Sequence, residues 1–340
     1  MSTSPIPPPL PARSVHRPSL GRAVAVLVLV AVAALVPLLG PSVALNGTGE
    51  AAAPGAGGIA LLRTVLFAAV CVPAGEVFAG WLARRVRGMS EGPESAAPPR
   101  SWAALASGAG CLAALGLASV VATGNLVPRR LADMDIGGLY QTRDGALALI
   151  EVNAFLLTAV LARSRRPATQ LLPLAAIVVA EALRAHPTTE STPLIGSALT
   201  LVHVVCASLW VGGLLYVLRT VWRWRGTAPR AGAALLGLYA RVAAVLLAAV
   251  TATGVVSTLR RMPQDTVVDQ LLTTAYGRTL VAKVLLVAVV ALLALVARRR
   301  LRGAADPLTA YAPARAEVAV LGVVVAASAL LTAVPIPIRW

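Results

Sequence analysis

The amino-acid sequence predicts an all-α protein, a polytopic bundle of transmembrane helices. Of its 340 residues, 58% are hydrophobic and 13% are charged, whereas soluble domains average about 45–50% and about 25%. The charged residues are gathered between long apolar runs. These runs are continuous and lack the period-two alternation of a membrane β-barrel. Composition and patterning therefore exclude a soluble globular enzyme, a disordered chain and a disulfide scaffold.

Nine apolar runs approach the roughly 20 residues that a helix needs to cross the hydrocarbon core. They predict spans over residues 21–40, 59–81, 102–121, 145–162, 168–185, 196–218, 236–259, 277–297 and 316–334. Eight spans remain if the first run is a cleaved signal peptide, because basic residues precede it and Ser42-Val43-Ala44 is similar to a cleavage site. The pair Gly212-Gly213 predicts that a neighbouring helix approaches the sixth span closely.

The runs divide the chain into three parts. Residues 1–20 are rich in proline and predict a flexible cytoplasmic tail. Residues 21–185 predict an N-terminal set of transmembrane helices, and residues 186–340 predict a second transmembrane domain. No loop between the spans is long enough for an appended soluble domain.

The arginines predict the orientation of the bundle. Every second loop between the spans carries most of the arginines. The loops on the other side of the membrane carry few arginines, and aspartates in the same loops offset their charge. Basic loops face the cytoplasm, which places the N-terminus inside and Trp340 outside the membrane. The formal net charge of +16 therefore indicates contact with the lipid bilayer and not with nucleic acid. Lys283 is the only lysine, and the sequence contains no phosphate-binding loop motif.

Ionisable residues inside the spans are the strongest functional signal. Burying such a residue in hydrocarbon costs free energy unless it pairs with another polar group or faces a water-filled cavity. Counting residues along the helices places five of them in the outer third of the bilayer: Glu151, Glu181, His186, His203 and Lys283. We expect them to face one another in a cavity that is open to the exterior, with His203 beside Glu181. Glu151 and Lys283 then form an intramembrane polar network, in which Lys283 either neutralises a glutamate or takes part in transport.

One helix also carries a candidate metal site. His203 lies three residues before Cys206 and seven residues before Trp210, so that all three lie on one face of the helix. Imidazole and thiol together suit copper or zinc. Cys206 is equally compatible with a small core residue, and His186, which precedes a proline, with a solvated helix end.

The segment from His186 to the end resembles the copper resistance D (CopD) family of membrane proteins. The resemblance is carried by the run from His203 to Gly213 (HVVCASLWVGG), by Thr253-Gly254, by Tyr276-Gly277-Arg278 with Lys283 five residues later, and by Leu330-Leu331-Thr332-Ala333-Val334-Pro335. It implies that residues 186–340 form a CopD-like domain of a plasma-membrane protein that handles copper. The family is credited with inward copper transport, sometimes beside a CopC-like external copper carrier.

We therefore expect copper transport or uptake, linked to copper homeostasis or resistance. Copper would bind at His186 and His203 with help from Glu181 or Cys206. No nucleophile–base arrangement is visible, so an enzyme is not expected. Two alternatives stay open: a b-type haem electron carrier with His186 and His203 as axial ligands, and a structural or assembly protein whose buried charges only set the helix register.

Overall fold

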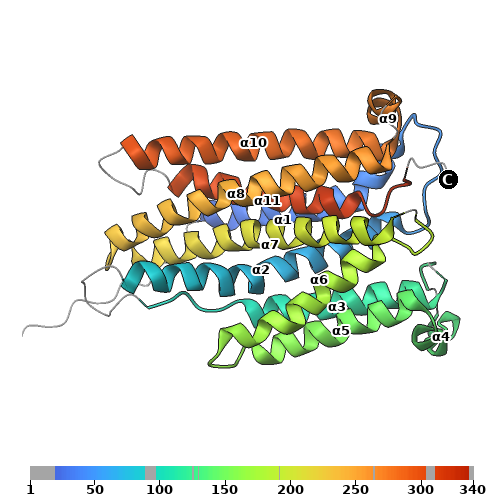
Figure 1. Cartoon of the computed structure of the whole chain (residues 1–340), viewed down its shortest axis with the longest axis horizontal. Helices are drawn as coiled ribbons and strands as arrows, with labels where there is room; N and C mark the ends of the chain where they lie inside the picture. Colours follow the sequence, from blue (N-terminus) through green and yellow to red (C-terminus); the bar gives the residue numbers. More distant parts are fainter. Residues whose placement is uncertain are drawn as a thin grey trace, which may run out of the picture.

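The computed structural model describes residues 20–88, 97–124, 126–128, 130–190, 192–262, 265–303 and 311–336, and within these ranges the regular structure is entirely helical (Figure 1). The long helices are α1 (Leu20–Leu45), α2 (Ala56–Gly88), α3 (Ala103–Ala122), α5 (Arg143–Leu161), α6 (Leu171–Arg184), α7 (Pro193–Trp224), α8 (Pro229–Arg261), α10 (Ala275–Gly303) and α11 (Tyr311–Leu330). The short helices are α4 (Ile136–Gln141), α9 (Val267–Thr273) and the 3₁₀ turns Leu131–Asp133 and Pro167–Gln170.

The prediction of a polytopic helical bundle is confirmed. Each of the nine apolar runs coincides with a helix, and seven helical segments within the described residues are long and apolar enough to cross a membrane. The described part of α1 adds a shorter apolar stretch, Ala31–Leu45. The helices extend beyond the predicted spans, since α7 and α8 have 32 and 33 residues. Both begin with proline, which favours the first helical position because its missing N–H has no partner there.

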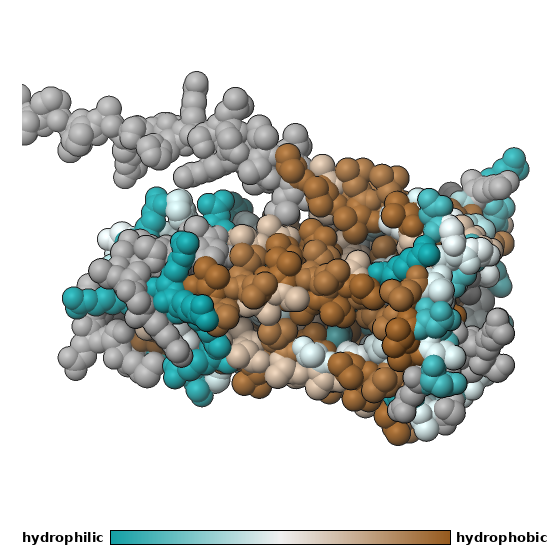
Figure 2. All heavy atoms as spheres, turned by 90° about the horizontal axis from the view of Figure 1, so that it is seen from above, coloured by the Kyte–Doolittle hydropathy of each residue, from teal (hydrophilic) through white to brown (hydrophobic). Residues whose placement is uncertain are grey.

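The surface shows a broad apolar belt between two polar ends (Figure 2). We call one of them the arginine-rich end, because it includes the last turns of α2, α7 and α10 and the links from α5 to α6 and from α7 to α8. The opposite end carries the short helices α4 and α9 (Figure 1). A belt of this kind is what a bilayer requires of a chain that crosses it several times.

Helices α2 and α7 lie at the centre of the bundle, and one hydrophobic cluster packs on each side of them. The first cluster joins them to α8, α10 and α11 and includes Trp210, Val217 and Tyr239. The second joins α2 to α3, α5 and α6 around Phe155 and Ile177. The bundle therefore has two halves that share the pair α2 and α7.

This central pair crosses at two glycines, which confirms the close approach predicted at Gly212. A Cβ atom on Gly212 would lie 1.7 Å from the carbonyl oxygen of Cys71, and one on Gly75 would lie 2.0 Å from the carbonyl carbon of Gly212. Backbone therefore meets backbone, and only glycine fits. This crossing sets the position of α7, which carries the candidate metal ligands.

Candidate functional site

Four charged side chains join α2, α5 and α6, and we call them the charge cluster. Arg63 Nη1 lies 2.7 Å from Glu181 Oε2, and Arg184 Nη2 lies 3.0 Å from Glu151 Oε2. Arg184 also lies 3.7 Å from the other oxygen of Glu181. The two glutamates are only 1% and 5% exposed, so each needs its guanidinium partner. Two cations balance two anions, and the charge cluster ties three helices together.

The charge cluster corrects the expected partners of both glutamates. Depth along the helices predicts Lys283 next to Glu151 or Glu181, and His203 next to Glu181. The arginines of α2 and α6 occupy these carboxylates instead. Arg63 has no place in the sequence-based network, although a charge inside the apolar run 59–81 is itself a signal of a buried partner.

His186 lies just beyond the end of α6 and is held from two sides. Its Nδ1 lies 2.6 Å from Glu190 Oε2 and its Nε2 lies 2.9 Å from Thr200 Oγ1. Glu190 also pairs with Arg260 at 3.2 Å. Burial lowers the pKa of His186, and this loss of water outweighs the effect of Glu190. The neutral ring donates its Nδ1–H to Glu190 and accepts the hydroxyl proton of Thr200, so both nitrogens are occupied.

His203 lies on α7 and reaches α8 through Thr253. Its Nδ1 lies 2.9 Å from Thr253 Oγ1, and this hydroxyl lies 2.7 Å from the carbonyl oxygen of Ala249 in its own helix. The single hydroxyl proton goes to Ala249, so Thr253 accepts the Nδ1–H of His203. The other partner of the ring is the backbone carbonyl of Val250, which can only accept, so the lone pair of the neutral ring on Nε2 meets no hydrogen-bond donor among the described residues. A fixed tautomer with one free nitrogen is the form in which histidine binds a metal ion.

Cys206 and Trp210 follow His203 along α7. Cys206 is a free cysteine, half-buried against the first hydrophobic cluster, to which Trp210 belongs. Within the described ranges, no three His, Cys, Asp or Glu side chains gather into a group that could hold a metal ion. The expected single pocket that joins Glu181, His186, His203 and Cys206 is thus not present there, because the first two are held by partners of their own.

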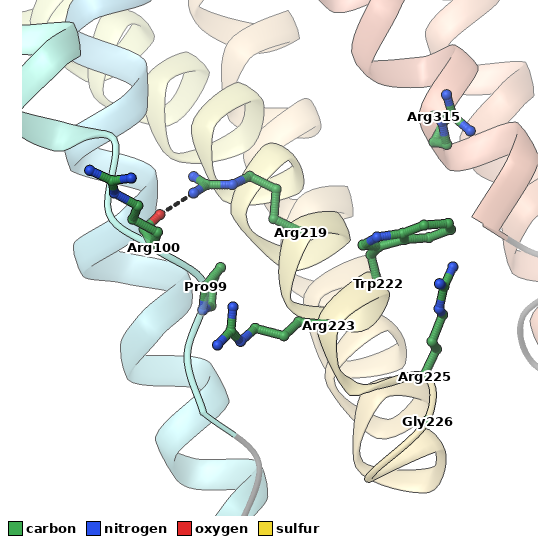
Figure 3. Close-up of a pocket in the computed structure, with 8 residues that line it drawn as sticks. All are labelled: Pro99, Arg100, Arg219, Trp222, Arg223, Arg225, Gly226 and Arg315. Atoms are coloured by element: carbon green, nitrogen blue, oxygen red, sulfur yellow. Dashed lines mark hydrogen bonds between the residues drawn. The ribbon is translucent and has the colours of Figure 1, made fainter. Parts of the chain in front are cut away.

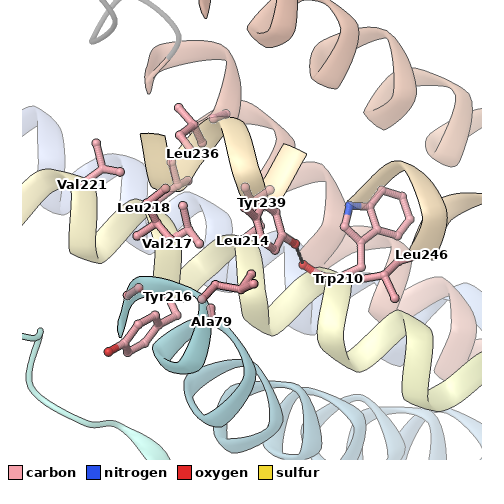
Figure 4. Close-up of a cluster of buried hydrophobic side chains, with 14 of the residues drawn as sticks. Ala79, Trp210, Leu214, Tyr216, Val217, Leu218, Val221, Leu236, Tyr239 and Leu246 are labelled. Carbon is pink, nitrogen blue, oxygen red and sulfur yellow. Dashed lines mark hydrogen bonds between the residues drawn. The ribbon is translucent and has the colours of Figure 1, made fainter. Parts of the chain in front are cut away.

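A cavity of about 290 Å³ continues from Trp210 toward the arginine-rich end. It lies between α7, α8, α10 and α11, and alanine and leucine side chains form most of its wall. Its polar lining consists of Trp210, Tyr239, Arg298 and Glu317. The Tyr239 hydroxyl donates to the carbonyl oxygen of Trp210 (Figure 4). The buried indole N–H of Trp210 lies toward the carboxyl group of Glu317, which is 4% exposed.

Lys283 is half-buried on α10, close enough to His203 for the two charges to interact. Among the described residues it has no hydrogen bond or ion pair. It therefore belongs to the surroundings of His203 and not to the charge cluster.

Comparison with curated proteins and with solved structures gives no match for this chain. A family model does match: residues 233–332 correspond to the family described as Copper resistance protein D, or CopD. The matched segment holds α8 from residue 233, α9, α10 and α11, and with them Thr253, Lys283 and Glu317. It begins after His203 and Cys206, which pack against it from α7. The chain is therefore a multi-pass membrane protein whose residues 233–332 match the CopD family.

Proposed function

We propose that this protein moves copper ions inward across the plasma membrane. The observation that carries the proposal is the ring of His203, whose Nδ1 contacts Thr253 in the segment that matches CopD and whose Nε2 carries a lone pair without a hydrogen-bond donor among the described residues. Imidazole is a ligand that copper favours. The acceptor on Nδ1 is the usual way in which proteins fix the ring of a metal-binding histidine.

A route through the bundle follows from the same helix face. His203, Cys206 and Trp210 are spaced at i, i+3 and i+7, which corresponds to about 10 Å along α7. The cavity of about 290 Å³ begins at Trp210 and contains the carboxyl group of Glu317. Copper bound at His203 would pass the thiol of Cys206 and reach this carboxyl group. Each step offers a donor atom in an otherwise apolar setting.

Lys283 suits such a route because it weakens the first site. Its positive charge lies within reach of His203 and opposes a bound cation. An ion pathway needs sites that release the ion as well as bind it. We assign to Lys283 this role, which replaces the expected pairing with a glutamate.

Direction follows from the charges at the two ends. The arginine-rich end faces the cytoplasm by the positive-inside rule, which puts His203 in the half of the bundle nearer the exterior. A negative interior then favours inward movement by about 2.3 kcal/mol per charge for each 100 mV. An external carrier of the CopC type would deliver copper at the end that carries α4 and α9.

His186 and Glu181 take a smaller part in this proposal. Copper reaches His186 Nε2 only by displacing the hydroxyl of Thr200, and it reaches Glu181 only by competing with Arg63. The same contact of Thr200 disfavours haem, because an axial ligand needs this nitrogen. The charge cluster then serves to hold the helices beside α7 in place.

Cellular copper accumulation under copper supply tests the proposal. His203→Gln and Cys206→Ala should lower accumulation at unchanged protein levels. Cys111→Ala is the matched control, because Cys111 is also a free cysteine but packs in the second hydrophobic cluster. Wild-type accumulation in the His203→Gln variant, with normal amounts of protein in the membrane, would overturn the proposal.

A further inference from the structure

The arginine-rich end contains a large basic pocket that copper passage does not use. Its volume is about 760 Å³, and Figure 3 shows the side chains that line it. It lies between the segment that precedes α3, the last turn of α7 and the first turns of α11. The lining residues are Pro99, Arg100, Arg219, Trp222, Arg223, Arg225, Gly226 and Arg315.

The charge of this pocket is strongly one-sided. Five of its lining residues are arginines, and the described lining contains no carboxylate. Arg219 is neutralised from outside the pocket, because its Nη1 lies 3.0 Å from Glu76 Oε1. Arg100, Arg223 and Arg225 are solvent-exposed. A concave surface with this excess of guanidinium groups attracts anions.

Two tryptophans place the pocket at the border of the apolar belt. The Arg225 guanidinium lies 3.6 Å from the centre of the Trp222 ring, and the Arg219 guanidinium lies at the same distance of 3.6 Å from Trp102. Trp222 and Trp102 are 40% and 44% exposed. Tryptophan at this level marks the depth of the lipid headgroups. Stacking on the rings also holds the guanidinium planes in place before any ligand arrives.

We propose that this pocket binds the phosphate group of an anionic membrane lipid. Guanidinium groups form paired hydrogen bonds with phosphate oxygens, and basic pockets between membrane helices are suited to lipid headgroups. A soluble phosphate would find the same guanidinium groups. The lipid is favoured because the acyl chains of a bound molecule lie beside the apolar belt while its phosphate enters the pocket.

The test uses the purified full chain in detergent, titrated with phosphatidylglycerol or with zwitterionic phosphatidylcholine, with bound lipid counted by native mass spectrometry. The variant Arg223→Gln/Arg225→Gln removes two guanidinium groups from the pocket. The control Arg165→Gln/Arg166→Gln removes two exposed arginines from the link between α5 and α6, at the same end but outside the pocket. Inorganic pyrophosphate, added in place of the anionic lipid, forms the third arm.

We expect the wild-type chain and the control to retain phosphatidylglycerol in preference to phosphatidylcholine. The pocket variant should bind phosphatidylglycerol about thirty-fold more weakly. Each arginine near an anionic lipid surface contributes about 1 kcal/mol to binding, and the loss of about 2 kcal/mol from two arginines corresponds to about thirty-fold in Kd. Equal retention of both lipids, or an equal loss in the control, would overturn the proposal. Binding of pyrophosphate that matches the binding of phosphatidylglycerol in the same titration would overturn the assignment to a lipid.

Discussion

The substitution Gly212→Ala tests the central crossing of α2 and α7. The new methyl group would lie 1.7 Å from the carbonyl oxygen of Cys71, 2.6 Å from its carbonyl carbon and 3.1 Å from the Cα of Gly75. All three atoms belong to the backbone, so no side chain can turn away. The helices must move about 1.7 Å apart for the first contact to reach an ordinary 3.4 Å.

Two effects of opposite sign decide the magnitude. Alanine favours the helix over glycine by up to about 1 kcal/mol, whereas an overpacked interior loses about 1–3 kcal/mol. Because the clash is with backbone, we place the packing loss at the upper end and expect a net loss of about 2 kcal/mol in the free energy of unfolding. Gly108→Ala is the matched control, since a Cβ atom on Gly108 in α3 meets nothing within 4 Å.

The assay is unfolding of the purified protein in detergent, followed by circular dichroism. Gly212→Ala should unfold at a lower temperature or denaturant concentration than the wild type, and Gly108→Ala should be as stable or slightly more stable. A Gly212→Ala variant of wild-type stability would refute the close crossing and with it the position of α7.

Three further predictions concern the charged and hydrogen-bonded groups. Glu181→Ala should lower the free energy of unfolding by about 3–5 kcal/mol because it leaves Arg63 without its buried partner; adding Arg63→Ala should restore part of the loss in the same assay, and a further loss would show that the pair does not stabilise the fold. Because the pKa of His186 is lowered on folding, the unfolded chain binds a proton that the folded ring excludes, so stability should fall as the pH drops through about 6.5. In His186→Gln the melting temperature should depend less on pH between pH 8 and 5. An unchanged pH dependence would show that other groups cause the loss of stability in acid. Thr253→Val should weaken copper binding by about 10–100-fold in a titration, because His203 loses the acceptor that fixes its tautomer; an unchanged affinity would remove Thr253 from the site.

The helices could be predicted from the sequence because a bilayer constrains them so strongly. An apolar run of about 20 residues has few alternatives to a helix in hydrocarbon, and each of the nine runs is helical in the structure. The ends were less predictable. Helices α7 and α8 continue past the apolar runs into the arginine-bearing turns, where nothing in the hydropathy marks the last residue.

The partners of the buried charges could not be predicted in the same way. Counting residues gives the depth of a side chain, from the rise per residue, but not the direction in which it points around the helix axis. Depth along the helices matches Glu181 with His203, yet Glu181 turns toward Arg63 and Arg184, and His203 turns toward Thr253. The direction depends on which helices are neighbours, and the crossing of α2 and α7 decides this in three dimensions.

Copper content of the purified protein tests the central claim most directly. The full chain is equilibrated with copper, washed and analysed for bound metal, with the His203→Gln and His186→Gln variants in parallel. Because the Nε2 of His203 meets no hydrogen-bond donor among the described residues while both nitrogens of His186 are occupied, we expect copper in the wild-type protein, a severe loss in His203→Gln and a smaller one in His186→Gln. Copper retained in full by a correctly folded His203→Gln protein would contradict this expectation.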